Sequence, residues 1–437
     1  MTSRRKPGAL LPRGSPGMPL AVVRACWWLG AAALACGSCG GEGDGSGEST
    51  SDSMEQRVSS ELELPLTLIE VEHADTAVSV GFLPGGDLLV GGTGTLNSVA
   101  PLGGSVPWVA RIDPEGEVSL QELEGLPFLV GTGYALVAPA ESGGYFEIAN
   151  SDQPGTAGFN CQGAARLAKR DPDGKKEWEF LLDPAIGGWS VVSATSLPDG
   201  TNLAAGCGWD TLPRGADKLR TFATLWRLAG DGELDWTREL TSQEDSEVTV
   251  GMARGADRVM LMTEHRWTSY PELKASLRAV DLYGEDLWTV ELKQPSVERW
   301  VDFGAAPNGA PFALGEQPGG AGFGFLLVQL DWDGQVEFTT ARFGYWPPAA
   351  AAAANDGGVL VAGYTGFSTN EGASFAAYLV RLSPEGEELW RQVFLCDEDC
   401  EFQDVAASED GQVAAVGSRY RDGIETAWVV RFGPEQN

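Results

Sequence analysis

The feature that most constrains this chain is a unit of about fifty residues that recurs along most of its length. Each copy opens with a Gly-containing turn and a short apolar strand, followed by a polar loop. A second strand, an acidic turn with Gly, and a last strand that often carries Trp complete the unit. The copy at Ala353–Phe394 shows all of these parts. Its Gly turns and Trp390 are therefore expected to be structural.

Two landmarks define the copies. The Gly turn with its apolar strand occurs at Leu83–Gly92, Ala140–Asn150, Leu197–Gly206, Arg254–Thr263, Ala306–Gly315, Asn355–Gly363 and Glu409–Gly417. The second strand with its acidic turn occurs at Trp108–Val118, Ala164–Trp178, Ala223–Trp236, Ser276–Trp288, Leu326–Val336, Tyr378–Trp390 and Trp428–Asn437. Both landmarks thus occur seven times. The turn glycines from Gly116 to Gly386 are spaced 50 to 58 residues apart.

A period near fifty with four strand-like segments per unit is typical of a β-propeller blade. The seventh copy stops after Phe432, before its outer strand, whereas Leu64–Val71 precedes the first copy and is available to replace it. Pairing these two segments would close the ring and remove exposed sheet edges. The sequence therefore predicts an all-β fold, a seven-bladed β-propeller of four-stranded antiparallel blades closed by an N-terminal strand. Ala349–Ala354 is assigned to an innermost strand, against its helix propensity.

The N-terminus predicts export. Residues 25–35 form an apolar run too short to span a bilayer but suited to the core of a signal peptide. Small residues before Cys36 resemble the lipobox of bacterial lipoproteins, which implies a lipidated cysteine. Leu34 stands at the second position before Cys36 rather than the third, so ordinary secretory cleavage is the alternative. We expect a signal peptide at 1–35, a disordered Gly, Ser and acidic tether at 36–62, and the propeller at 63–437.

The cysteines of the repeat region suit an oxidising compartment. Cys396 and Cys400 have a spacing that a small loop disulfide closes, and Cys161 and Cys207 lie in corresponding loops of neighbouring copies. We expect both bridges. Zinc is the competing interpretation, but the chain has only two histidines, far apart, so no metal site is predicted.

The charge of the chain argues against nucleic-acid partners. It carries 62 acidic and 30 basic residues, a net charge of −32. The first 35 residues contain five of the basic residues and no acidic one. The remaining chain is therefore still more negative and repels phosphate backbones.

Four turns, at Asp171–Trp178, Gly230–Trp236, Tyr283–Trp288 and Ser383–Trp390, resemble those of PQQ-like (quinoprotein-type) repeats. In that family an acidic Gly turn is followed by a Trp that docks between blades. The resemblance implies packing roles for Trp178, Trp236, Trp288 and Trp390. The constellation that binds quinone and Ca²⁺ in catalytic members has no match here, nor has their adjacent-cysteine pair, so neither cofactor is predicted. Non-catalytic relatives include lipoprotein scaffolds such as the eight-bladed propeller of the outer-membrane barrel-assembly machinery.

Binding residues are expected in the long loops between the second and third strands of each blade, because loops on a rigid scaffold commonly carry function. The main loops are Thr93–Pro107, Ser151–Gly163, Cys207–Thr221, Glu264–Lys274 and Tyr364–Phe375. The candidate ligand-face residues are Trp209, Asp210, Glu264, Trp267, Tyr270, Tyr364 and Phe367. Aromatic and acidic groups of this kind suit a sugar, a peptide or a cationic group. The alternative is that these rings pack against neighbouring loops.

The leading hypothesis is an exported, lipid-anchored, monomeric propeller that acts as a non-catalytic binding or scaffold module at the bacterial cell envelope, on the outer membrane or cell surface. Its partners would be the membrane, through the lipid, and a protein or glycan. No catalytic residue is predicted, because neither histidine lies in a recognisable Ser or Cys frame. One alternative is an exported quinone-dependent or glycan-active enzyme. Another is an envelope assembly factor that pairs a blade edge with a partner strand.

Overall fold

The computed structural model describes residues 66–71, 74–94, 106–123, 133–140, 143–151, 163–182, 188–211, 219–240, 247–265, 274–294, 296–305, 310–319, 322–343, 347–369, 372–396 and 398–433. The predicted signal peptide, the tether and Cys36 lie outside these residues and stay predictions. Every regular element in the described part is a β-strand. Within it, no helix of the length and apolarity needed to cross a membrane is found.

The strands form seven four-stranded antiparallel sheets. In six of them the strands follow chain order from the axis outward, and in the seventh β1 is the outermost strand. Blades 1 and 2 consist of β2 (Thr76–Phe82), β3 (Leu88–Gly94), β4 (Val106–Ile112), β5 (Val118–Glu122), and β6 (Tyr134–Pro139), β7 (Tyr145–Asn150), β8 (Ala165–Arg170), β9 (Lys176–Leu182). Blades 3 and 4 consist of β10 (Gly188–Ser196), β11 (Asn202–Thr211), β12 (Leu219–Leu228), β13 (Leu234–Glu239), and β14 (Glu247–Arg254), β15 (Arg258–His265), β16 (Ala275–Asp281), β17 (Asp286–Leu292). Blades 5 and 6 consist of β18 (Arg299–Ala305), β19 (Pro311–Gly319), β20 (Gly322–Leu330), β21 (Val336–Phe343), and β22 (Pro348–Ala353), β23 (Val359–Thr369), β24 (Gly372–Leu382), β25 (Glu388–Phe394). Blade 7 consists of β26 (Cys400–Ala407), β27 (Val413–Arg421), β28 (Ile424–Phe432) and β1 (Leu66–Val71).

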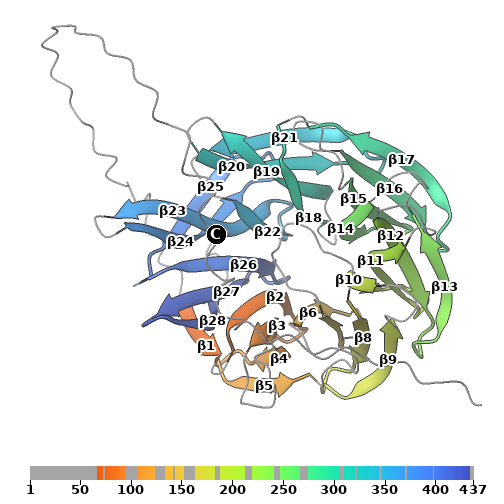
Figure 1. Cartoon of the computed structure of the whole chain (residues 1–437), viewed down its shortest axis with the longest axis horizontal. Coiled ribbons are helices and arrows are strands. Elements are labelled where there is room, and N and C mark those ends of the chain that lie inside the picture. Colours follow the sequence, from red (N-terminus) through yellow and green to blue (C-terminus); the bar gives the residue numbers. More distant parts are fainter. Residues whose placement is uncertain are drawn as a thin grey trace, which may run out of the picture. The chain divides into compact units, whose positions relative to one another are not determined.

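The predicted seven-bladed propeller and its closure are confirmed. Strand β1 lies beside β28 (Figure 1) and pairs antiparallel with it, in a register that joins Leu66 to Phe432 and Val71 to Ala427. The alanine-rich segment forms β22, an innermost strand, as predicted. Small side chains fit there because innermost strands crowd around the axis, and tertiary position overrides helix propensity.

The tryptophans of the outermost strands pack on glycines of the next blade. A Cβ atom on Gly232 would lie 2.7 Å from the ring of Trp178, and one on Gly284 would lie 2.7 Å from Trp236. Both glycines also have positive φ angles, +85° and +87°, that favour glycine. Trp288 covers Gly334 in the same way. These three tryptophans therefore have the inter-blade packing role that was predicted.

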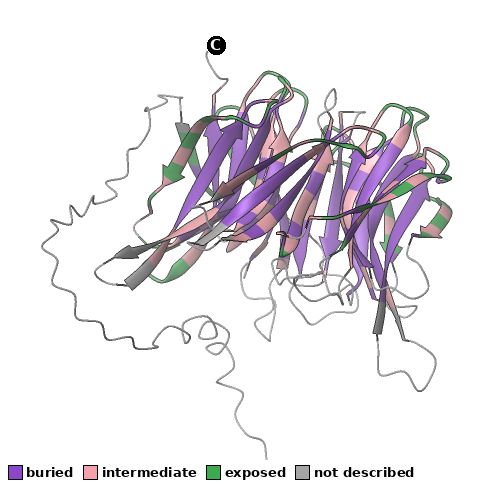
Figure 2. Ribbon diagram, turned by 90° about the horizontal axis from the view of Figure 1, so that it is seen from above, coloured by how far each residue is buried: buried purple, intermediate pink, exposed green. Residues whose placement is uncertain are grey.

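The ring has two distinct sides. We call "turn face" the side that carries the tight turns, such as Leu83–Asp87 and Asp113–Glu117, and "loop face" the side on which the innermost strands begin. Figure 2 shows exposed turns along one side and buried strands across the middle of the ring. The exposed residues of the turn face are mainly those at the tips of these turns.

Two predicted loops are in part strand, which corrects the sequence analysis. Strand β11 continues to Thr211 and β12 begins at Leu219. Much of Cys207–Thr221 is therefore paired. Strands β23 and β24 pair from Val359↔Leu382 out to Thr369↔Gly372, and Tyr364–Phe375 is mostly a hairpin extension. The Thr and aromatic residues of these segments favour strand structure, a preference that their polarity concealed.

Candidate functional site

Polar side chains gather on the loop face of blades 5 to 7. Strands β18 and β26 begin there, β19 ends there, and β23, β27 and β28 extend past it. We call "loop-face cluster" the residues that these strands and the turn before β26 contribute and that interact electrostatically with one another: Arg299, Glu316, Tyr364, Asp399, Glu401, Tyr420 and Glu425. The cluster contains four carboxyl groups, two phenols and one guanidinium group.

Tyr364 is the residue of the cluster that interacts with both its blade 5 and its blade 7 members. Its ring meets that of Phe375 edge to face, with 5.7 Å between the ring centroids. Burial raises the pKa of its phenol, and the charges of Glu401 and Glu316 raise it further while Arg299 opposes them. The phenol therefore stays protonated and can donate a hydrogen bond.

Glu401 is the first acid after the start of β26. Burial raises the pKa of its carboxyl group, although a hydrogen bond from Gln403 opposes the shift. The Gln403 Nε2 atom donates to Glu401 Oε1 at 2.6 Å, and Ser418 Oγ donates to the same oxygen at 3.5 Å. These contacts fix the carboxyl group in one orientation.

Tyr420 and Glu425 form the blade 7 side of the cluster. Burial raises the pKa of Tyr420 to about 12, with the charge of Glu425 and a hydrogen bond to it as the next causes. Thr76 Oγ1, from blade 1, donates to Glu425 Oε1 at 2.8 Å. On the blade 5 side, burial raises the pKa of Glu316, whose Oε2 lies 3.5 Å from Nη2 of Arg299. Glu316 and Arg299 balance each other on the blade 5 side, and the excess of carboxyl groups lies on the blade 7 side.

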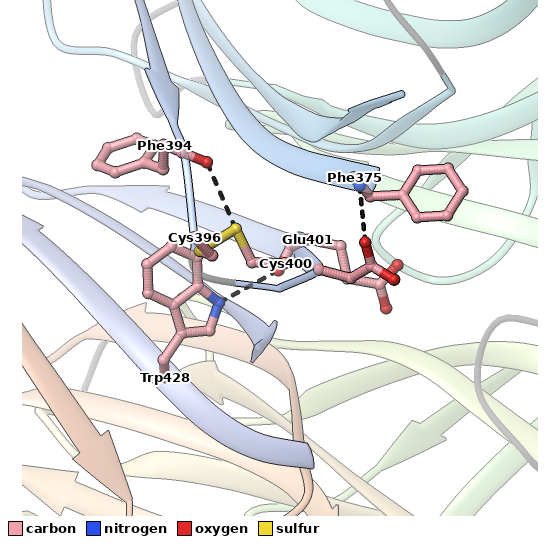
Figure 3. Close-up of a disulfide and its surroundings, with 7 residues drawn as sticks. Phe375, Phe394, Cys396, Cys400, Glu401 and Trp428 are labelled. Atoms are coloured by element: carbon pink, nitrogen blue, oxygen red, sulfur yellow. Dashed lines mark hydrogen bonds between the residues drawn. A yellow bond between two sulfur atoms is a disulfide. The ribbon is translucent and has the colours of Figure 1, made fainter. Parts of the chain in front are cut away.

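A disulfide holds the middle of the cluster in place. Cys396 and Cys400 are bonded, as predicted, and close the short connection from β25 to β26 (Figure 3). Within this connection Asp399 Oδ1 accepts the backbone N–H of Phe375 at 2.8 Å. Trp428 Nε1 donates to the carbonyl oxygen of Glu401 at 3.3 Å, and its ring stacks on Phe402. Both Asp399 and Glu401 are therefore fixed by groups of blades 6 and 7.

Two further carboxyl groups lie on the innermost strands, immediately after β-bulges. Asp302 accepts the N–H groups of Phe303 and Ala351 at 2.7 and 2.8 Å. Asp404 accepts those of Val405 and Val80, both at 2.8 Å. Each therefore links its blade to the next. Burial raises the pKa of Asp302 to about 6 and that of Asp404 to about 7, the latter also through the charge of Asp302.

Sequence reasoning missed these two aspartates because a polar residue inside an apolar strand gives no periodic signal. Their equivalents after the bulges in other blades are small residues such as Ser79 and Ala350. Repeat alignment is therefore the signal that would have found them. Ser79 has a similar linking role, since its Oγ lies 3.1 Å from the N atom of Val137 in blade 2.

A second polar group surrounds His265 in blade 4. Its Nε2 lies 3.3 Å from Glu247 Oε1 and 3.1 Å from Ser276 Oγ. A Ser–His–acid relay needs the two ring nitrogens to face different partners. Here one nitrogen faces both groups, so the arrangement is not such a relay. Glu247 is almost fully buried, and it also accepts a hydrogen bond from Thr263.

The structure places the predicted ligand-face residues in different surroundings. Tyr364 belongs to the loop-face cluster. Trp209 packs with Cys207 and Val248 between blades 3 and 4, and Glu264 accepts the backbone N–H of Trp300 at 2.9 Å. Trp209 thus packs between blades, in line with the alternative stated for the rings, and Glu264 links blade 4 to blade 5. The side chains of Asp210, Trp267, Tyr270 and Phe367 lie outside the described residues.

The other predicted bridge is described on one side only. Cys207 is disulfide-bonded, whereas Cys161 lies outside the described residues, so the Cys161–Cys207 pair stays a prediction. Across the described strands and turns, no group of three or more His, Cys, Asp or Glu side chains is arranged to hold a metal ion.

No protein-family model matches the sequence, and neither does any curated protein. Solved structures match the fold. The Dos1 propeller is 13% identical, with 83% of this chain and 94% of that chain aligned at a TM-score of 0.51. The polysaccharide lyase Uly1 is 8% identical over 84% and 91%, at 0.49, and the β-propeller domain of the Trilobed protease from Pyrococcus furiosus is 12% identical over 81% and 94%, at 0.44. At such identities the first likeness shows the propeller fold alone.

Proposed function

We propose that the protein is an exported, lipid-anchored β-propeller that acts as a non-catalytic binding module at the cell envelope. We further propose that the loop-face cluster is its recognition surface for a cationic, amine-bearing partner. The observation that carries this proposal is the imbalance of the cluster, which contains four carboxyl groups and two phenols of raised pKa but one guanidinium group, that of Arg299.

The chemistry of the cluster favours a ligand with ammonium groups. Ionised carboxylates accept hydrogen bonds only, so they complement the three donors of an ammonium group. Tyrosine rings add attraction for cations placed over their faces. The net charge of the chain, −32, draws cations toward the surface from a distance.

The fixed orientation of these groups supports binding rather than chemistry. Glu401 is held by Gln403 and Ser418, and Asp399 by the N–H of Phe375. Groups held in this way lose little conformational freedom when a ligand binds, which increases affinity.

A pair of peptides that differ only in charge tests the proposal. Tetralysine and its fully Nζ-acetylated form are titrated into the full chain by calorimetry at low and moderate salt. We expect the charged peptide alone to bind, with an affinity that falls as salt rises. Glu401→Gln and Tyr364→Leu should each weaken binding about two- to tenfold, because the first removes one charged contact and the second one cation–π contact.

The matched control is Glu285→Gln, an equal change of charge in an exposed turn of the turn face. If it weakens binding as much as Glu401→Gln does, the attraction is a property of the whole acidic surface and the cluster is not the site. Equal binding of the acetylated peptide would also contradict the proposal. Oxidation of an alcohol or sugar after addition of PQQ and Ca²⁺ would favour the enzyme alternative instead.

The proposed export and anchoring rest on the N-terminal sequence and on the Cys396–Cys400 disulfide, since such bridges persist in oxidising compartments. Changing Cys36 to Ser should release the protein from the membrane fraction, because lipid attachment needs that thiol. Retention of the variant in membranes would show that another element anchors the chain.

A further inference from the structure

Arginine side chains bridge most neighbouring blades on the turn face. In each case a guanidinium group donates to a backbone carbonyl in a turn of the next blade. The described residues contain five such bridges: Arg111 to Pro172 (2.6 Å), Arg227 to Leu282 (2.9 Å), Arg258 to Trp332 (3.3 Å), Arg342 to Gly386 (2.9 Å) and Arg431 to Asp113 (3.2 Å). Guanidinium groups therefore fill the spaces between turns around much of the ring.

The bridge from blade 7 to blade 1 shows which hydrogen-bond acceptors line such a space. Arg431 Nη1 donates to the carbonyl of Asp113, in the turn between the third and outermost strands of blade 1. Its Nη2 donates to the carbonyl of Gly86, in the turn between the first two strands, at 3.0 Å. One guanidinium group thus satisfies acceptors on two turns of the neighbouring blade.

The described residues show no such bridge between blades 6 and 7. They show none between blades 2 and 3 either, where Lys169 occupies the equivalent place and pairs with Glu177 of its own blade. Arg381 occupies the place in β24 that Arg431 occupies in β28, but its Nη1 donates to the carbonyl of Leu382 in its own strand at 2.8 Å. Its Nη2 pairs with Asp356, also in blade 6. The reason lies in the closure, because β1 comes from the other end of the chain and blade 7 has no turn between its third and outermost strands. Arg381 therefore has no such carbonyl to reach.

A cavity of about 220 Å³ is present at this interface. It lies between the first turns of blades 6 and 7, and its polar lining consists of Asn355, Asp356, Arg381, Glu409, Asp410 and Gly411. Gly411 occupies in blade 7 the place of Gly86 in blade 1, whose carbonyl binds Arg431. Three acids face one arginine here, so the lining carries a net negative charge.

The acids differ in what they already bind. Hydrogen bonds from Ser408 and Gln412 lower the pKa of the Asp410 carboxyl group. Burial raises the pKa of Asp356, but the N–H of Gly358 and the pairing with Arg381 together lower it by more, so its net shift is downward. The carboxylate of the exposed Glu409 has no ion pair or hydrogen bond to another described residue. It is therefore available to an incoming cation.

We infer that this cavity is a binding site for a guanidinium group from outside the chain, such as the side chain of an arginine in a partner peptide. The incoming group would take the place that Arg431 fills at the next interface, with Glu409 as its ion-pair partner and the Gly411 carbonyl as an acceptor. The planar fork of a guanidinium suits this combination better than an ammonium group does. The site is on the opposite face from the loop-face cluster and does not depend on it.

Blocked arginine (N-acetyl-arginine methylamide) titrated into the full chain, with chemical shifts or heat as the readout, tests this inference. Blocked citrulline, which has the same shape without the charge, is the matched probe, and agmatine tests whether the peptide part contributes. We expect only the two guanidinium compounds to bind. Glu409→Gln should weaken binding about two- to fivefold, the range of a single exposed ion pair. Ala407→Leu, which adds bulk at the cavity wall, should abolish it.

Two controls separate this site from other acidic surface. Glu285→Gln and Glu233→Gln, two charge changes in exposed turns of the same face, should leave binding of blocked arginine unchanged, and melting curves should show that Ala407→Leu remains folded. Binding of citrulline with the same affinity, or equal weakening by all three charge changes, would overturn the inference. So would the absence of any binding to the unmodified chain.

Discussion

Blades 4 and 5 are joined by different kinds of contact from those that join blades 6 and 7. At the first interface, Trp288 covers Gly334, Arg258 reaches the carbonyl of Trp332, and Glu264 holds the N–H of Trp300. Each contact uses a turn or strand that the repeat provides. The interface is therefore an ordinary product of the repeated sequence.

At the second interface the turn that Trp390 would cover is missing. Trp390 packs instead against Phe432, the last residue of β28, with 6.4 Å between the ring centroids. Phe394 contacts Phe402, Trp428 and Phe432, and the Cys396–Cys400 bridge closes the connection. Aromatic packing and a covalent bond thus replace the Trp-on-Gly contact and the arginine bridge, and a cavity remains. The use of β1 as the outermost strand of blade 7 therefore changes how blade 6 packs against blade 7, in addition to pairing the edge of β28.

Removing the closing strand should have the largest effect on this comparison. Deletion of Leu66–Val71 exposes the edge of β28 and removes the buried side chains of Ile69 and Val71. The burial term alone is about 3–6 kcal/mol of unfolding free energy. We expect a large fall in the melting temperature of the whole domain. A melting curve like that of the intact chain would show that blade 7 is stable with three strands.

Substitution of a turn glycine tests the ordinary interfaces. Gly284→Ala should lower the unfolding free energy by about 2–4 kcal/mol, because it adds a left-handed backbone penalty and a clash with Trp236. Gly200→Ala is the control, since Gly200 has a similar φ of +83° but no atom within 4 Å of the added Cβ. It should cost only the backbone penalty of about 1–2 kcal/mol. Equal losses in chemical denaturation would show that the tryptophan contributes nothing at this position.

The disulfide tests the replacement at blades 6 and 7. The paired change Cys396→Ser and Cys400→Ser frees a loop of five residues, for which the loop-entropy relation gives a loss of about 2 kcal/mol. We also expect weaker binding at the loop-face cluster, because Asp399 and Glu401 flank Cys400. Equilibrium denaturation and the tetralysine titration measure the two effects separately. Unchanged values in both would leave the bridge without a structural role.

A smaller effect is expected from pH. Asp302 and Asp404 have pKa values of about 6 and about 7 in the folded protein, above the ordinary value of 3.8. The folded state therefore binds more protons than the unfolded state between these limits, and stability falls as pH rises through them. From pH 6 to pH 8 the loss is about 1–2 kcal/mol.

The variant Asp404→Asn should flatten that slope, whatever its effect on stability at a single pH. Glu285→Gln changes the net charge equally and should leave the slope as it is. If both variants flatten the slope to the same degree, general charge repulsion rather than the innermost strands sets the pH dependence.

The repeat made most of the fold predictable. Gly116 and its counterparts mark turns whose φ angles only glycine adopts easily, so their spacing fixed the number of blades. The missing outer strand after Phe432 and the spare segment before the first copy together predicted the closure. These inferences succeeded because local turn chemistry and the global ring agree.

The candidate site was less predictable. Tyr364 is the one residue of the predicted ligand face that lies in the cluster. Glu316, Glu401 and Tyr420 come from blades 5 and 7, and no local sequence pattern brings them together. Trp209 and Glu264 had the right residue types in the right loops, yet their side chains are used between blades. A repeat indicates which residues have the same place in every blade. It does not show which residues outside the repeat pattern lie close together in the folded ring.

The pairing of β1 with β28 also has a consequence for how the chain reaches its native state. Leu66 and Phe432 are partners although 366 positions separate them, whereas all three strand pairs of each of the other blades join strands that are consecutive in the chain. Contacts of such length carry the greatest loop-closure entropy and form slowly. Blades 1 to 6 can each form from one continuous segment of chain, but blade 7 needs β1 together with β26 to β28 and so cannot be completed until the last strands are synthesised. We expect completion of the circle to be the slowest step of folding, and the one that leaves a hydrophobic edge exposed for longest.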